Sequence, residues 1–182
     1  NGPHMVIGKH NFIVKHNAEE IARRLGNALV APVLAYVPEG RIDPPEGHMR
    51  FPGTISLPND VFVKVTEYSA RSFRANGFKD IVLIGDSGPN QKGLQVVAAQ
   101  LNKEWVGSGV RVHYIGDYYS TTAFGAWLKK QGLSAADIGT HAGVEDTSEL
   151  MAIAPEHIRK DKLAPGGDFG VTGVAGNPTR AT

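Results

Sequence analysis

The sequence predicts an α/β fold, a three-layer α/β/α sandwich with a mostly parallel sheet. Three apolar runs, at 28–37, 80–85 and 110–115, lack the alternation of a half-exposed strand. Such runs suit strands that are covered on both faces. Before, between and after these runs lie stretches with helical spacing of apolar residues, at 11–25, 59–75, 92–105 and 120–131. Strands that alternate with helices at this interval indicate a parallel sheet between helix layers.

The first helix is supported by its boundaries as well as by its spacing. Apolar residues recur along it, and Gly26 follows its last apolar residue, Leu25. A glycine just past the last turn is a common helix stop.

The segment 38–58 is expected to be a long loop, because it holds five prolines and three glycines. In a doubly wound sheet, ligands bind beyond the carboxyl ends of the strands. This loop, residues 86–90 and the segment after Ile115 are therefore expected to surround one crevice.

Composition limits the class of partner. Of 182 residues, 41% are hydrophobic, which is enough for one domain and predicts a single domain over 1–182. Lysine plus arginine (19) nearly balances aspartate plus glutamate (18), so neither nucleic acid nor a membrane surface is expected as a partner. No cysteine is present, which leaves histidine and carboxylates as candidate metal ligands. We expect a small-molecule substrate and favour a cytoplasmic location.

Two clusters combine turn formers with chemically active side chains. His10 enters the first helix after a turn-rich segment that begins at Asn1. Asp86 and Ser87 directly follow a buried strand. The competing interpretations are structural, since His10 can equally be read as a capping or surface residue and Asp86 as a helix cap.

Two further clusters follow the same pattern. His141 precedes two carboxylates, Glu145 and Asp146, at the start of a helix, although Asp146 would also serve as a cap. His48 precedes a Phe-Pro-Gly-Thr segment that begins at Phe51 and has no catalytic spacing of its own.

Taken in order, these four clusters resemble the creatinine amidohydrolase (creatininase) family. Members carry Glu-x-His-Gly-Pro-His-Leu-Pro-Leu-Gly-Thr-Asp, then His-x-x-Phe-Pro-Gly-Thr, then Asn-Gly-His-Gly-Gly-Asn, then His-Ala-Gly-x-x-Glu-Thr-Ser. The resemblance spans about 170 residues and is strongest at 51–56 and 141–143. It implies the family's α/β fold, and it suggests that the family's first strand and last helix lie outside this sequence.

The resemblance also implies a metal site with altered ligands. Asn1 stands where the family has a histidine ligand, His10 where it has a bridging aspartate, and Asp86 where it has a second histidine. The last two changes are reciprocal, and imidazole and carboxylate both bind zinc, manganese, iron or nickel. We therefore expect Asn1, His10 and Asp86 to converge and one divalent metal to be kept in the full-length protein, because a neutral imidazole offers one nitrogen and no negative charge to hold two ions together.

The implied activity is hydrolysis of an amide or cyclic amide C–N bond in a small molecule by metal-activated water. His141 and Asp146 take the positions of the family's acid/base histidine and its acidic partner, with Glu145 a further catalytic candidate. Substrate contacts are expected from residues around the crevice, namely His48, Ser87, Tyr118 and Tyr119; a core role for the two tyrosines is equally open. Relatives commonly form hexamers, so a homo-oligomer is expected.

Other activities fit parts of the sequence. Gly85-Asp86-Ser87 is also typical of serine hydrolases, with Ser87 as nucleophile and a distant histidine as base. A non-enzymatic descendant, or an isomerase or lyase on the same fold, would also agree with the changed ligands.

Overall fold

The computed structural model describes residues 2–120, 122–166 and 172–182. Its contacts divide the chain into two compact units. The first unit contains Asn1–Ala35, Arg50–Thr54 and Thr122–Thr182, and the second contains Tyr36–Met49 and Ile55–Thr121. Each unit has its own buried apolar cluster. The single domain expected from composition stays a prediction.

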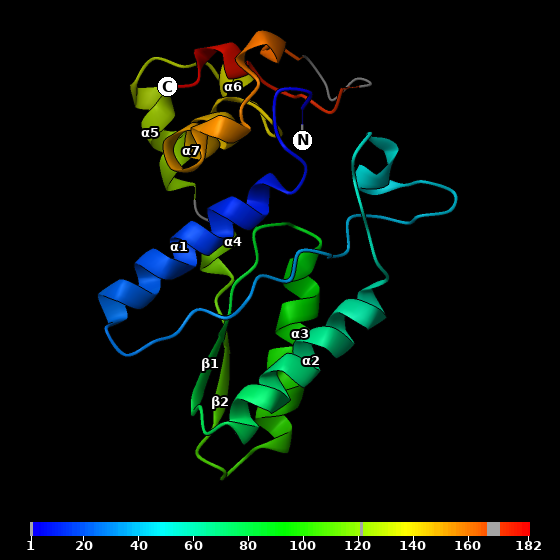
Figure 1. Ribbon diagram of the computed structural model, residues 1–182, viewed down its shortest axis with the longest axis vertical. Helices are drawn as coiled ribbons and strands as arrows, with labels where there is room; N and C mark the ends of the chain where they lie inside the picture. The colour runs from blue at the N-terminus through cyan, green and yellow to red at the C-terminus, as the bar shows by residue number, and fades with distance from the viewer. Residues whose placement is uncertain (1, 121, 167–171) are drawn as a thin grey trace. The chain divides into compact units, whose positions relative to one another are not determined.

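The second unit is a small α/β layer structure (Figure 1). Strands β1 (Asp80–Leu83) and β2 (Arg111–Tyr114) pair in parallel. Helices α2 (Asn59–Ala75) and α3 (Asn90–Glu104) pack on each other and on the strands. Their shared core is apolar and consists of Ala70, Ile81, Val97, Ala98, Leu101, Trp105 and Val112. The predicted α/β class and the parallel pairing are confirmed.

The crossing of α2 and α3 depends on a glycine. A β-carbon on Gly93 would lie 2.8 Å from Cδ1 of Phe62, which is 3% exposed. Real β-carbons essentially never approach that closely. The missing side chain therefore lets the two helices pack closely at this point.

The first unit is mainly helical. Its longest helix is α1 (Lys9–Leu25), which packs against α7 (Val144–Ile153), and α5 (Ala123–Lys130) and α6 (Ala135–Ile138) precede α7 in the chain. The left-handed Gly26 ends α1, as expected, and its N–H donates to the carbonyl of Ala22. The predicted helix at 11–25 is confirmed and begins two residues earlier.

Backbone segments of the first unit pass close to one another at several glycines, among them Gly139, Gly143 and Gly176. A β-carbon on Gly139 would collide with the carbonyl oxygen of Ala175, and one on Gly143 with that of Ile138. A β-carbon on Gly176 would lie 2.8 Å from the α-carbon of Gly143. These three positions have no room for any side chain.

Two expected elements differ from the structure. Residues 28–37 form no strand in the described chain and are mostly exposed. A strand needs a neighbour to satisfy its N–H and C=O groups, and this segment pairs with neither β1 nor β2. The helix expected at 120–131 is found as α5, which begins three residues later and ends one residue earlier, and the short helix α4 (Asp117–Ser120) lies before it.

The remaining elements are short. The loop at 38–58 is confirmed, with only a 3₁₀ turn, η1 (Gly47–Arg50), within it. Three more 3₁₀ turns follow α7, namely η2 (Pro155–His157), η3 (Lys160–Lys162) and η4 (Pro178–Arg180). None of the helices described has the length and apolar character that crossing a membrane requires.

Candidate active site

The His141 turn (140–143) connects α6 to α7 and is held by a neighbouring segment. The N–H groups of Thr140 and His141 donate to the carbonyl of Ala175, at 2.8 and 3.3 Å, and Ala175 returns a bond of 2.8 Å to the carbonyl of His141. Ala142 is fully buried with a φ of 53°, in the left-handed region that side chains rarely adopt. The turn is therefore a rigid support for its histidine.

The imidazole of His141 has a defined orientation. Its Nδ1 lies 2.6 Å from the carbonyl oxygen of Gly173, and a carbonyl only accepts, so Nδ1 carries the proton. Nε2 is then the basic nitrogen. Burial lowers the pKa of His141, which favours the neutral ring near neutral pH. A neutral histidine with one nitrogen held by a carbonyl is a suitable general base.

Asp146, in the first turn of α7, binds two partners with its two oxygens. Oδ2 accepts a hydrogen bond of 2.6 Å from the N–H of Ala142. Oδ1 lies 2.5 Å from Nζ of Lys9. Burial alone would raise the pKa of Asp146, but the charges of Lys9 and His10 and the Ala142 bond outweigh it and hold that pKa well below its usual range. The group is therefore a carboxylate.

Lys9 is the first residue of α1 and is completely buried. Within the described chain, its Nζ has no hydrogen bond of ordinary geometry, although Asp146 lies at ion-pair distance. We regard the contact as an ion pair, because charge attraction depends on distance rather than on angle.

His4 is also completely buried, and its Nε2 lies 3.0 Å from the hydroxyl of Thr147. Burial, together with the charge of Lys9, lowers the pKa of His4 to about 4. Its Nδ1 has no partner among the described residues. His4 is therefore a neutral residue of the interior at neutral pH.

Two further candidates lie in the same unit. His10 is partly exposed and sits near enough to Asp146 for its charge to lower the pKa of that carboxyl. Glu145 is partly buried, and burial, with the charge of Asp146, raises the pKa of its carboxyl. The structure thus gathers His10, His141, Glu145 and Asp146 in the first unit. The ring of His141 is oriented by the carbonyl of Gly173, whereas Asp146 binds the backbone of the turn.

The second unit holds a separate hydrogen-bonded cluster, Glu39, His48 and Ser87, which we call the loop cluster. One oxygen of Glu39 accepts from the hydroxyl of Ser87 at 2.7 Å, and the other lies 2.5 Å from Nδ1 of His48. A serine nucleophile needs an imidazole against its hydroxyl. Here the carboxylate lies between the two groups, so the arrangement does not support Ser87 as a nucleophile.

The other predicted residues of the second unit lie near the ends of its strands. Asp86 follows β1 and is partly buried. Tyr118 and Tyr119 belong to α4, after β2. The hydroxyl of Tyr119 would lie 3.2 Å from a β-carbon on Gly88, so this ring covers the turn after β1.

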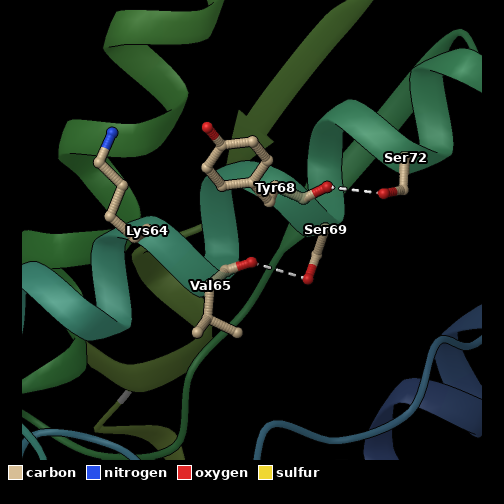
Figure 2. A pocket seen from close by; sticks show the side chains of 5 residues that line it. All are labelled: Lys64, Val65, Tyr68, Ser69 and Ser72. Carbon is tan, nitrogen blue, oxygen red and sulfur yellow. Dashed lines mark hydrogen bonds between the residues drawn. The ribbon is translucent and has the colours of Figure 1, made fainter.

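Two hollows lie in the second unit. One has a volume of about 680 Å³ and is lined by part of the loop cluster, Glu39 and His48, together with Arg41, Asp43 and Asn59. The other, shown in Figure 2, is a shallow hollow on α2. There, the hydroxyls of Ser69 and Ser72 donate to carbonyls of their own helix. The first hollow is the better candidate for a small ligand.

A complete set of metal ligands is not found in the part of the chain that the structure describes. No group of three or more histidine, aspartate or glutamate side chains there could hold an ion. Asn1 lies outside the described residues, His10 belongs to the first unit and Asp86 to the second. Their convergence on one ion stays a prediction.

Comparison with known proteins identifies the class. The chain belongs to the creatinine amidohydrolase (creatininase) family, whose sequence model matches residues 1–182. It is 26% identical to the mycofactocin precursor peptide peptidase of Mycolicibacterium smegmatis, covering 100% of this chain and 72% of that protein. It is 24% identical to the 3-dehydro-scyllo-inosose hydrolase of Thermotoga maritima, covering 88% of this chain and 49% of that protein.

Solved structures agree on the fold. A structure named "Creatininase Mn" and a mutant creatininase complexed with creatine each superimpose with a TM-score of 0.78 at 23% identity. Each covers 100% of this chain, which matches 77% and 78% of those chains. The creatininase fold expected from the four sequence clusters is confirmed.

Sequence reasoning missed Lys9 and Glu39. The family segment quoted above has threonine at the position of Lys9, one residue before His10, so a charged residue there was a detectable signal. Glu39 lies in an irregular loop, and no spacing rule connects it to Ser87, which is 48 residues away. Only the folded structure reveals the hydrogen bond between Ser87 and Glu39.

Proposed function

We propose that this chain is a hydrolase that cleaves an amide or cyclic amide C–N bond of a small molecule, with His141 as its general acid/base. Family membership supports a hydrolase, and both named relatives are hydrolytic enzymes by name. The observation that carries the assignment is the bond from Nδ1 of His141 to the carbonyl of Gly173. This bond leaves Nε2 as the basic nitrogen, which is the atom that a general base needs.

The proposed step uses the chain's own residues. Nε2 of His141 takes a proton from a water molecule as its oxygen attacks the carbonyl carbon. The resulting imidazolium returns the proton to the nitrogen as the C–N bond breaks, so that a carboxylic acid and an amine are formed. The negative charge of Asp146 raises the pKa of His141, against the lowering effect of burial, and so favours the imidazolium.

A divalent metal is part of the proposal at the level of the family. The relative named "Creatininase Mn" supports manganese as the ion to test first. One zinc, manganese, iron or nickel ion per full-length chain is expected, and it would polarise the carbonyl and acidify water. The role proposed for His141 does not depend on which residues bind the metal. Elemental analysis after incubation with Mn²⁺ measures the metal content per chain.

A small substrate is favoured over a long one. The hollow of about 680 Å³ lined by Glu39 and His48 falls within the range of small-molecule pockets, roughly 300–1,000 Å³. We propose that the loop cluster binds a small ligand within the second unit, with Tyr119 beside the turn after β1. Relatives are named for a peptide and for a cyclic sugar-like compound, so the assay panel should contain creatinine, other cyclic amides, formamides and short peptides.

The test is the replacement His141→Gln, assayed on whichever member of the panel the protein hydrolyses. Loss of a general acid/base lowers kcat by roughly 10²–10⁴-fold. The matched control is His157→Gln, because His157 is a partly buried histidine of the same unit whose ring contacts that of Phe12 at a tilt. An unchanged kcat in His141→Gln, with His157→Gln also active, shows that the assignment is wrong.

A further inference from the structure

Lys9 sits where a positive charge is unfavourable for two separate reasons. It is completely buried, and lysine is almost never fully buried unless it is paired. It is also the first residue of α1, where the N–H groups that have no partner within the helix give this end a partial positive charge. A lysine kept in such a place must interact with something that offsets both costs, and in the described chain that group is Asp146.

We propose that Lys9 is a positioning residue, a built-in cation that fixes the carboxylate of Asp146 and, through it, the His141 turn. The inference rests on the proposed function only in taking His141 as the catalytic group. Lys9 itself is not catalytic, because its side chain is inaccessible.

An ion pair and a hydrogen bond connect Lys9 to Asp146 and Asp146 to Ala142. Oδ1 of Asp146 faces Nζ of Lys9 at 2.5 Å, and Oδ2 accepts from the N–H of Ala142 at 2.6 Å. Ala142 is the only non-glycine residue of the described chain with a positive φ. A carboxylate anchored at one oxygen can hold this unfavourable backbone with the other. The residue whose turn is held in this way is His141.

The same ion pair bears on whether Asp146 could bind a metal. An ammonium group already lies against this carboxylate, so a divalent ion bound to the same group would face a like charge at short range. Asp146 is therefore assigned to Lys9 rather than to a metal. A single fixed charge here has the role that a bound cation would otherwise perform.

Thermal unfolding gives the first test. Lys9→Met keeps the length of the side chain but removes its charge, so that Asp146 loses its ion pair and keeps only the hydrogen bond from Ala142. Breaking a buried pair in this way should lower Tm by roughly 10 °C in a chain of this size. The same change at Lys15, an exposed residue of α1 paired with Glu19, should shift Tm by only about 1–2 °C.

A double variant distinguishes loss of the ion pair from general damage to the fold. In Lys9→Met/Asp146→Asn both charges are gone, and the amide oxygen of the new asparagine can still accept the Ala142 bond. We expect this variant to recover at least half of the lost Tm. A Tm for Lys9→Met equal to that of the unmodified protein overturns the proposal. So does a double variant that is less stable than Lys9→Met.

Chemical rescue and NMR test the positioning role itself. Lys9→Ala leaves space beside Asp146 that n-propylammonium should fill, which would raise the Tm of this variant but not that of Lys9→Ala/Asp146→Asn. In ¹⁵N-histidine spectra, the His141 signals, identified by their loss in His141→Gln, should shift in Lys9→Met. They should return in Lys9→Ala when n-propylammonium is added.

His141 signals identical in Lys9→Met and the unmodified protein would falsify the positioning role. Rescue of Lys9→Ala by Mn²⁺ but not by n-propylammonium would also overturn it, since the site would then be a vacated metal position. None of these readouts needs a substrate. Failure of the Lys9 proposal is therefore separate from failure of His141→Gln to lose activity.

Discussion

At the scale of single residues, the site is built from groups whose charge is set by burial. His4 is the clearest example. It is completely buried, and burial lowers its pKa from 6.5 to about 4. The folded protein thus holds a neutral ring under conditions in which the unfolded chain binds a proton. Stability must therefore depend on pH through this residue.

The sign follows from the direction of the shift. The contribution of His4 is complete above the unfolded pKa of 6.5 and is lost as pH falls towards its folded pKa of about 4. We expect the free energy of unfolding to decrease over this interval by at most about 3 kcal/mol from His4. Urea unfolding at several pH values between 6.5 and 4 measures the slope.

The control for this prediction is His4→Gln, whose amide can still bond to Thr147 but does not titrate. It should flatten the slope between pH 6.5 and 4. Asp146 acts at lower pH, because its pKa is held below the usual range, so its contribution is lost only as pH falls through that depressed value. An equally steep slope in His4→Gln would show that another group is responsible.

For the candidate site of the first unit, the sequence suggested individual residues but not the partners that they contact. His141, Glu145 and Asp146 were named from one motif, and the structure places them on one turn and the helix that follows it. The motif could not show that Asp146 binds a main-chain N–H instead of the imidazole. That choice depends on Lys9 and Gly173, which are 137 and 27 residues from Asp146 in the chain. Contacts over such separations leave no local pattern.

At the scale of elements, helices with clear periodicity were predicted well and strands less well. The prediction of 59–75 agrees with α2, and 80–85 and 110–115 contain β1 and β2. Residues 28–37 have the composition of a buried strand, but a strand exists only with a neighbour, and composition says nothing about pairing. The helix expected at 120–131 is present over Ala123–Lys130, so its type was predicted and only its boundaries differ.

The packing of α2 against α3 gives a prediction at this scale. Gly93→Ala places a methyl group against the ring of Phe62 and should destabilise the protein by about 1–3 kcal/mol, despite the better helix propensity of alanine. The measurement is urea unfolding followed by circular dichroism.

Gly125 is the matched control. It also lies within a helix, α5, but a β-carbon there meets nothing within 4 Å. Gly125→Ala should therefore stabilise the protein by up to about 1 kcal/mol. If both alanine variants change stability in the same direction, close packing at Gly93 is not what separates them.

At the scale of the whole molecule, the fold was predictable because four short segments occur in a fixed order. Identity to solved creatininase structures is only 23%, yet the TM-score is 0.78. Most positions therefore changed while the layout of turns and apolar runs remained. The roles of Asn1, His10 and Asp86 as metal ligands concern single side chains, which similarity of fold does not test, so they stay predictions.

The close backbone contacts at glycines of the first unit affect how the results of a mutational survey of this protein are interpreted. Gly139, Gly143 and Gly176 leave no space for a β-carbon, so nearly every codon change at these positions removes the folded protein. Selection for activity would then rank them beside His141, although none of them carries a reactive group. Measuring the abundance of each variant in parallel separates the two cases, because His141 variants should accumulate to normal levels and glycine variants should not.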